Sequence, residues 1–283
     1  MKRKKIILCE GDSWTAGDIF DPKLVGKDIH PGNVNHIENR PYRLPRVWPG
    51  KLEKLLKGVK VLNTSVSGSS NDGIVRRVIG NVLYLLHERK YKPEEIFVIV
   101  GWSSPERKDF FYRGDYDATE TIYPHEIDKK YGSYELDEFH KLYVTYFWNE
   151  EEYLLRFIRQ VLFLDSFLKS RGINYKFFNA FYEVKDSFII DKEKNYNFLD
   201  NLKNKVSEMN LNHIDDNSLF SLDILLQEIE KIYIDNFVKK SFQELVISNI
   251  DKIEEKEKYF EGYHPSELSH GLWAEFLTKQ INV

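Results

Sequence analysis

Residues 6–17 read Ile6-Ile7-Leu8-Cys9-Glu10-Gly11-Asp12-Ser13-Trp14-Thr15-Ala16-Gly17. Four consecutive apolar residues bounded by charge are typical of a strand that is buried on both faces of a parallel sheet. The Gly-Asp-Ser turn follows the carboxyl end of this strand, and the ligand-binding and active sites of open α/β sheets lie at that edge. Ser13 is therefore a candidate nucleophile, although a serine hydroxyl attacks well only when a neighbouring base takes its proton.

Three further apolar runs predict strands of the same sheet, at residues 59–63, 96–101 and 175–180. Amphipathic segments around them predict helices, over about 47–57, 71–89, 150–170, 222–232, 237–253 and 268–281. Strands that alternate with helices indicate a parallel sheet covered on both faces, so we expect a three-layer α/β/α fold of the flavodoxin-like kind. Residues 18–50, which include Pro41, Pro45 and Pro49, are expected to form a long ordered loop.

We expect a single domain over residues 1–283 with two insertions. Residues 105–145 are dense in charged and aromatic side chains and show no sustained period. Residues 183–260 carry mostly polar helical patterns rich in Lys and Glu, so we expect a helical insertion there, before the C-terminal loop.

Charge and composition narrow the class of partner. The chain has 41 basic and 45 acidic side chains scattered along its length. This pattern predicts no basic surface for binding nucleic acid or an anionic membrane. No apolar stretch approaches the ~20 residues of a membrane helix, and the apolar run behind the basic residues 1–5 is shorter than the ~7–15 residues of a secretory signal. We therefore expect a cytoplasmic protein. The single cysteine, Cys9, excludes an intramolecular disulfide and a cysteine-based metal cluster, and we expect no metal or other cofactor.

Three short blocks stand out: Gly11-Asp12-Ser13, the small-residue loop around Gly68, and Glu261-Gly262-Tyr263-His264-Pro265. They resemble the first, second and last blocks of the SGNH, or GDSL, hydrolase family, which is named for Ser, Gly, Asn and His. The resemblance implies that Ser13 is the nucleophile, Gly68 an oxyanion donor and His264 the general base. Glu261, where family members usually carry Asp, would orient the imidazole.

The third block departs from the family pattern of Gly-x-Asn-Asp, because this chain has Gly101-Trp102-Ser103-Ser104. The oxyanion would then meet the Ser103 hydroxyl or the side-chain N–H of Asn71, and the outright loss of one such donor costs ~3–4 kcal/mol. A similar Gly-Trp-Ser pattern with a nearby arginine, here Arg107, resembles SGNH-like proteins of phages and bacteria. Arg107 either binds an anionic part of a substrate or forms a structural ion pair, and Asp12 either belongs to the site or caps and braces the turn.

The resemblance implies acyl transfer through an acyl-enzyme on Ser13. We therefore predict a serine esterase acting on a small O-acyl ester. O-acetyl groups on a carbohydrate are favoured, because the aromatic residues of 105–145 suit stacking on sugar rings. A non-catalytic ligand- or glycan-binding protein, motivated by the missing asparagine, and an O-acyltransferase remain alternatives. The oligomeric state does not follow from the sequence.

Overall fold

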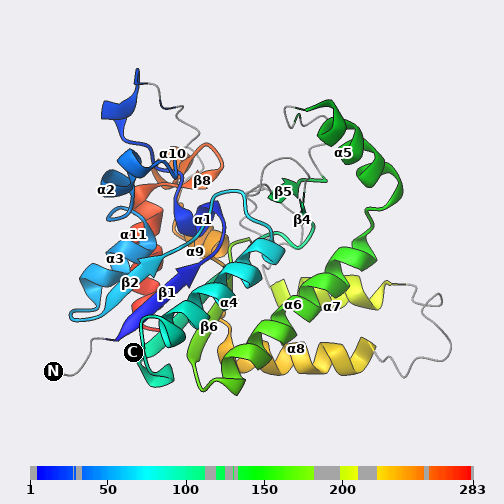
Figure 1. Cartoon of the computed structure of the whole chain (residues 1–283). Coiled ribbons are helices and arrows are strands. Elements are labelled where there is room, and N and C mark those ends of the chain that lie inside the picture. The colour runs from blue at the N-terminus through cyan, green and yellow to red at the C-terminus, as the bar shows by residue number, and fades with distance from the viewer. Residues whose placement is uncertain are drawn as a thin grey trace.

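A four-stranded parallel sheet forms the centre of the structure (Figure 1). The computed structural model describes residues 5–27, 29, 34–111, 119–124, 130, 133–181, 198–209, 222–251 and 255–281. The strands of the sheet are β1 (Ile6–Glu10), β2 (Lys60–Asn63), β3 (Ile96–Trp102) and β6 (Asn174–Asn179). Their order is β2-β1-β3-β6 and every neighbouring pair is parallel, which is the flavodoxin-like order expected from the sequence.

Alternate residues of the strands enter two separate cores. Ile6 and Leu8 of β1 belong to the core formed with α4 (Asn71–His87), α6 (Glu150–Ser170), α7 (Phe198–Ser207) and α8 (Leu222–Asn236). Ile7 and Cys9 belong to the core formed with α3 (Trp48–Leu55), α9 (Phe242–Ser248) and α11 (Glu267–Thr278). Because side chains alternate across a strand, each face of the sheet needs its own helical cover, and Figure 1 shows the two layers on opposite sides. The predicted three-layer α/β/α fold is confirmed.

Segments without a strong sequence period contain more regular structure than we predicted. The expected loop of 18–50 includes three short helices, η1 (Pro22–Leu24), η2 (Ile37–Asn39) and α2 (Arg40–Arg43). The stretch 105–145 contains the antiparallel strands β4 (Lys108–Phe111) and β5 (Thr119–Ile122) and the helix α5 (Tyr134–Tyr146). A further short helix, η3 (Pro93–Glu95), precedes β3.

The helix predicted over 237–253 is wrong at both ends, because α9 covers only Phe242–Ser248. Phe237 forms an isolated parallel bridge with Phe177 of β6, and the Val238 N–H donates to the Phe177 carbonyl at 2.8 Å. The backbone there extends the sheet, and the helix α9 begins only after the cap at Ser241. Parts of the predicted insertion 183–260 lie outside the described residues.

The chain ends in the elements that carry His264. The short helix α10 (Lys256–Tyr259) leads into a two-stranded hairpin of β7 (Phe260–Glu261) and β8 (His264–Pro265). Ser266 then caps α11 by accepting a hydrogen bond from the Ser269 N–H at 3.4 Å. None of the helices that the structure describes is long and apolar enough to cross a membrane.

Candidate active site

The Gly-Asp-Ser turn folds into a one-turn helix at the carboxyl end of β1. In this helix, α1 (Ser13–Ala16), the Asp12 side chain is the N-cap and accepts from the Trp14 N–H at 3.0 Å. Gly11 has to be glycine, because an added Cβ would lie 2.3 Å from the Thr15 hydroxyl oxygen. Within the described residues, the N–H of Ser13 has no hydrogen-bond acceptor. The turn therefore presents the Ser13 hydroxyl and its N–H together.

His264 lies against Ser13 although 251 residues separate them in the chain. The Nε2 atom of His264 is 3.1 Å from Ser13 Oγ, which is hydrogen-bond distance. Ser13 is 5% exposed, whereas the His264 side chain is 34% exposed. The β7–β8 hairpin, whose turn contains Gly262 at φ +64°, brings the imidazole to the end of β1. The structure thus brings together the nucleophile and base predicted from the sequence.

Asp18, which the sequence analysis missed, is the carboxylate that contacts this imidazole. Its Oδ2 atom lies 3.1 Å from His264 Nε2, and its Oδ1 atom accepts a hydrogen bond from the Ser67 hydroxyl. Asp18 directly follows the Gly17 that ends α1, so closeness to Ser13 in sequence was the signal that could have found it.

Glu261 does not have the contact that we predicted. It is paired with His264 across the hairpin, but its side chain is exposed and makes no hydrogen bond or ion pair with the described residues. The Nε2 atom of the imidazole is turned toward Ser13 and Asp18 instead. The orienting role assigned to Glu261 from the family pattern is therefore corrected to a solvent-exposed carboxylate.

The loop after β2 places Gly68 in a conformation that requires glycine. Its φ is +78°, and an added Cβ would lie 2.5 Å from the Tyr123 hydroxyl oxygen. That hydroxyl donates to the Gly68 carbonyl at 2.6 Å, which ties the loop to the segment after β5. In the part of the chain that the structure describes, the Gly68 N–H has no acceptor.

Ser103 and Asn71, the two predicted alternatives for the missing oxyanion donor, are both engaged elsewhere. The Ser103 hydroxyl donates to Asp12 Oδ2 at 2.7 Å, and its oxygen accepts from Arg107 Nη1 at 2.9 Å. The Asn71 amide accepts from the Ser103 N–H at 2.8 Å and donates to the Ser103 carbonyl at 3.1 Å. The prediction that either side chain points its donor at the oxyanion is therefore corrected, because the Ser103 hydroxyl is directed at Asp12 and the Asn71 amide at the Ser103 backbone.

Arg107 and Asp12 form a buried ion pair rather than a substrate-binding surface. Arg107 Nη1 lies 3.4 Å from Asp12 Oδ2, and the two side chains are 8% and 0% exposed. The guanidinium also lies over the rings of Tyr123 and Phe181, at 5.1 and 5.7 Å from their centroids. Of the two roles left open for each residue, the structure shows the ion pair for Arg107 and the brace for Asp12.

Glu10, the last residue of β1, is a fully buried carboxylate that the sequence analysis also passed over. It pairs with Arg77 of α4 at 2.9 Å. Burial raises the pKa of Glu10 from 4.5 to about 7, although the charge and hydrogen bonds of Arg77 oppose this. Burial, reinforced by the Glu10 charge, also raises the pKa of the neighbouring Cys9 thiol, which favours its neutral form. The sequence signal that could have identified Glu10 is a single acidic residue at the end of an apolar strand.

His270 on α11 is a fully buried histidine. Burial lowers its pKa to about 3, with smaller contributions from Lys51 and His264. The imidazole is therefore neutral over the range in which enzymes are usually assayed.

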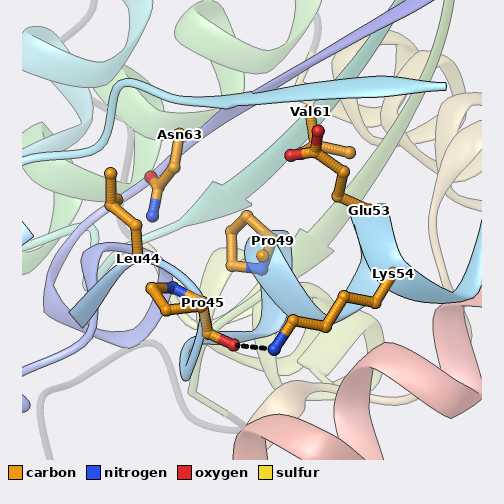
Figure 2. A pocket seen from close by; sticks show the side chains of 8 residues that line it. Leu44, Pro45, Pro49, Glu53, Lys54, Val61 and Asn63 are labelled. Carbon is orange, nitrogen blue, oxygen red and sulfur yellow. Dashed lines mark hydrogen bonds between the residues drawn. The ribbon is translucent and has the colours of Figure 1, made fainter. Parts of the chain in front are cut away.

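A cavity of about 430 Å³ lies between α3 and the edge strand β2 (Figure 2). Its wall is largely apolar and consists of Leu44, Pro45, Pro49, Gly50, Glu53, Lys54, Val61 and Asn63. Lys54 is turned to the loop before α3, where its Nζ donates to the Pro45 carbonyl at 3.2 Å. None of the residues predicted to act in catalysis lines this cavity.

Residues 32–222 match the model of a protein family described as a family of unknown function, DUF6071. No curated protein matches the chain. Solved structures that align with it include a member of the lipolytic protein G-D-S-L family from Veillonella parvula, with 12% identity and a TM-score of 0.45 over 97% of this chain and 96% of that one. A catalytic mutant of Axe2, an acetylxylan esterase from Geobacillus stearothermophilus, aligns with 13% identity and a TM-score of 0.45 over 99% and 94% of the two chains. Similarities of this size carry no argument about activity, which has to come from the site itself.

Proposed function

The chain belongs to DUF6071, a family of unknown function, and we propose that it is a serine esterase. The observation that carries the proposal is the 3.1 Å contact between Ser13 Oγ and His264 Nε2 at the carboxyl edge of a parallel sheet. A hydroxyl and an imidazole within hydrogen-bond reach are the pair that nucleophilic acyl transfer needs.

The reaction proceeds in two halves. Ser13 Oγ attacks the ester carbonyl while its proton moves to His264 Nε2, and the tetrahedral intermediate expels the alcohol, which takes that proton. Water then attacks the acyl-enzyme and gives a proton to His264, and the acid leaves as Ser13 Oγ takes that proton back from His264. The carboxylate of Asp18, 3.1 Å from Nε2, stabilises the imidazolium that forms in each half.

The oxyanion is held by two backbone donors. The N–H groups of Ser13 and Gly68 have no other acceptor among the described residues, and donors fixed in this way stabilise the charge that develops on the carbonyl oxygen. The side chains of Ser103 and Asn71 brace the loops and do not enter the hole. A site with two donors and no third is expected to turn over more slowly than one with three.

The proposed substrate is a small O-acyl ester, with an O-acetylated carbohydrate favoured. Support for the carbohydrate comes from exposed aromatic side chains in the insertion after β3. Phe111 is 81% exposed, Tyr134 76% and Tyr146 74%, and such rings stack on the apolar faces of sugars.

A non-catalytic binding protein is the second candidate, and one observation favours it. The Ser103 hydroxyl donates its hydrogen bond to Asp12, so the position of the family's asparagine offers no donor to an oxyanion. A protein that only binds an ester or glycan would tolerate this arrangement.

Turnover of p-nitrophenyl acetate and labelling by a fluorophosphonate distinguish the two candidates. For an esterase, the wild type hydrolyses the ester and is labelled, and Ser13→Ala and His264→Ala lose both properties. Ser248→Ala is a matched control, because this serine lies exposed on α9 and donates only to the Leu245 carbonyl. Wild-type protein that is neither labelled nor active at any pH would support the binding protein. Addition of sugar acceptors, with analysis of the products, detects transfer to another hydroxyl in place of water.

A further inference from the structure

We infer that the ion pair of buried Glu10 with Arg77 is a positioning device that holds the Gly68 loop against the Ser13 turn. The inference rests on the proposed function, because it concerns the two backbone donors of the oxyanion hole. Neither residue touches the reacting atoms in this arrangement. Both act through the loops that they join.

Glu10 is bonded to three different parts of the chain. Its Oε1 atom accepts from the Gly11 N–H at 3.2 Å, two residues before Ser13. The same atom accepts from Arg77 Nε and Nη2 at 3.0 and 2.9 Å. Its Oε2 atom accepts from the Thr64 hydroxyl at 2.7 Å. One carboxylate thus connects the nucleophile turn, the helix α4 and the start of the Gly68 loop.

Arg77 carries the connection to the far side of that loop. Its Nη2 atom donates to the Ser69 hydroxyl oxygen at 2.7 Å, and this hydroxyl donates to the Val66 carbonyl at 2.7 Å. The loop is also tied directly to the turn, because the Val66 N–H donates to the Gly11 carbonyl at 3.4 Å. Gly68 lies between Val66 and Ser69, so this chain of bonds fixes the peptide whose N–H would meet the oxyanion.

Charge is what makes the connection strong. Arg77 of α4 is the charged group that faces Glu10, the loop contributes only hydroxyls, and the neighbouring Cys9 thiol is neutral. A hydrogen bond between ionised partners is about twice as strong as one between neutral groups. Burial raises the pKa of Glu10 to about 7, so the carboxyl becomes neutral, and the connection weaker, in mildly acidic solution.

Kinetics of Glu10→Gln across pH test the inference. The variant keeps the shape of the side chain without its charge, so we expect kcat to fall by about 10- to 100-fold at about pH 8.5 with KM within about twofold. Below about pH 6 the wild-type carboxyl is itself neutral, so the ratio of the two kcat values should approach one. Taking the ratio removes every other pH dependence that the two proteins share. A ratio that does not change with pH would overturn the inference.

Two further variants separate positioning from a general loss of structure. Arg77→Lys retains the positive charge but not the bonds from both Nε and Nη2, so we expect it to lower kcat as well. Glu88→Gln, which changes an exposed glutamate at the end of α4, should match the wild type at every pH. Wild-type kcat in both Glu10→Gln and Arg77→Lys would contradict the role that we infer.

Amide hydrogen exchange gives a readout that does not depend on catalysis. At about pH 8, residues 64–69 should exchange faster in Glu10→Gln than in the wild type, while the amides of β3 remain equally protected. Faster exchange in a protein without esterase activity would leave the connection intact and refute the proposed function alone. Unchanged exchange in an active enzyme would refute the connection alone.

Discussion

Replacing Glu10 with Gln should make the protein more stable at neutral pH, even though we expect it to reduce turnover. The Glu10 side chain is fully buried, and its pKa is raised in the folded state from 4.5 to about 7. A pKa raised in the folded state means that the unfolded chain releases the proton first. The stability associated with neutral Glu10 is therefore complete below about pH 4.5 and is lost as the pH rises through about 7.

The size of the effect follows from the two pKa values. At about 1.4 kcal/mol for each unit of pKa, the change from 4.5 to about 7 corresponds to about 3 kcal/mol. Glutamine has the same shape and no charge to desolvate, so its contribution does not change with pH. The free energy of unfolding of Glu10→Gln minus that of the wild type should thus increase by about 3 kcal/mol between about pH 4 and pH 8.

Urea denaturation of both proteins at intervals across this pH range measures the difference directly. Subtracting one protein from the other cancels every titration that they share. A difference that stays constant with pH would show that Glu10 has an ordinary pKa. A difference that falls with pH would show that Arg77 stabilises the carboxylate by more than burial destabilises it. Either result would refute the reasoning.

Four other substitutions test the rest of the site. Asp18→Asn should lower kcat on p-nitrophenyl acetate by about tenfold, because the imidazolium of His264 loses its charged partner. Glu261→Gln should stay near the wild type. The reverse ranking would restore Glu261 as the orienting carboxylate. Arg107→Leu removes the arginine from buried Asp12 and should lower the free energy of unfolding in urea by about 3–5 kcal/mol. Gly68→Ala, strained at φ +78°, should lower kcat by about 100-fold with an unchanged circular dichroism spectrum; full activity would exclude the Gly68 N–H from the oxyanion hole.

The central fold could be predicted because its signals are local. Apolar runs such as 96–101 and the amphipathic pattern of 150–170 match β3 and α6 closely, since burial on both faces or on one face leaves a period in the sequence. The predictions that failed did so for other reasons. Phe237 pairs with Phe177 across the sheet edge, and no pattern within 237–253 reveals this partner. The helix α5 was missed because it buries only a narrow face, made of Leu136, His140 and Tyr143.

The residues of the site also divide into those that a local motif reveals and those that it does not. Ser13 and His264 could be identified because each lies in a short motif, and the structure brings the two side chains together. The partners of these residues could not be identified, because they depend on how distant loops meet. Asp18 contacts His264 only because the C-terminal hairpin lies over α1, and Asn71 meets Ser103 only because α4 begins beside the end of β3.

Two buried carboxylates on either side of Gly11 account for how the nucleophile turn is held. Glu10 pairs with Arg77 of α4, and Asp12 pairs with Arg107 after β3, so the turn is fixed from two elements at once. Buried ion pairs of this kind add little net stability, because desolvation offsets the attraction between the charges. Their value here is geometric. With Ser103 committed to Asp12, the proposed oxyanion hole has two backbone donors, and its effectiveness depends on the accuracy with which the Ser13 and Gly68 peptides are placed rather than on the number of donors.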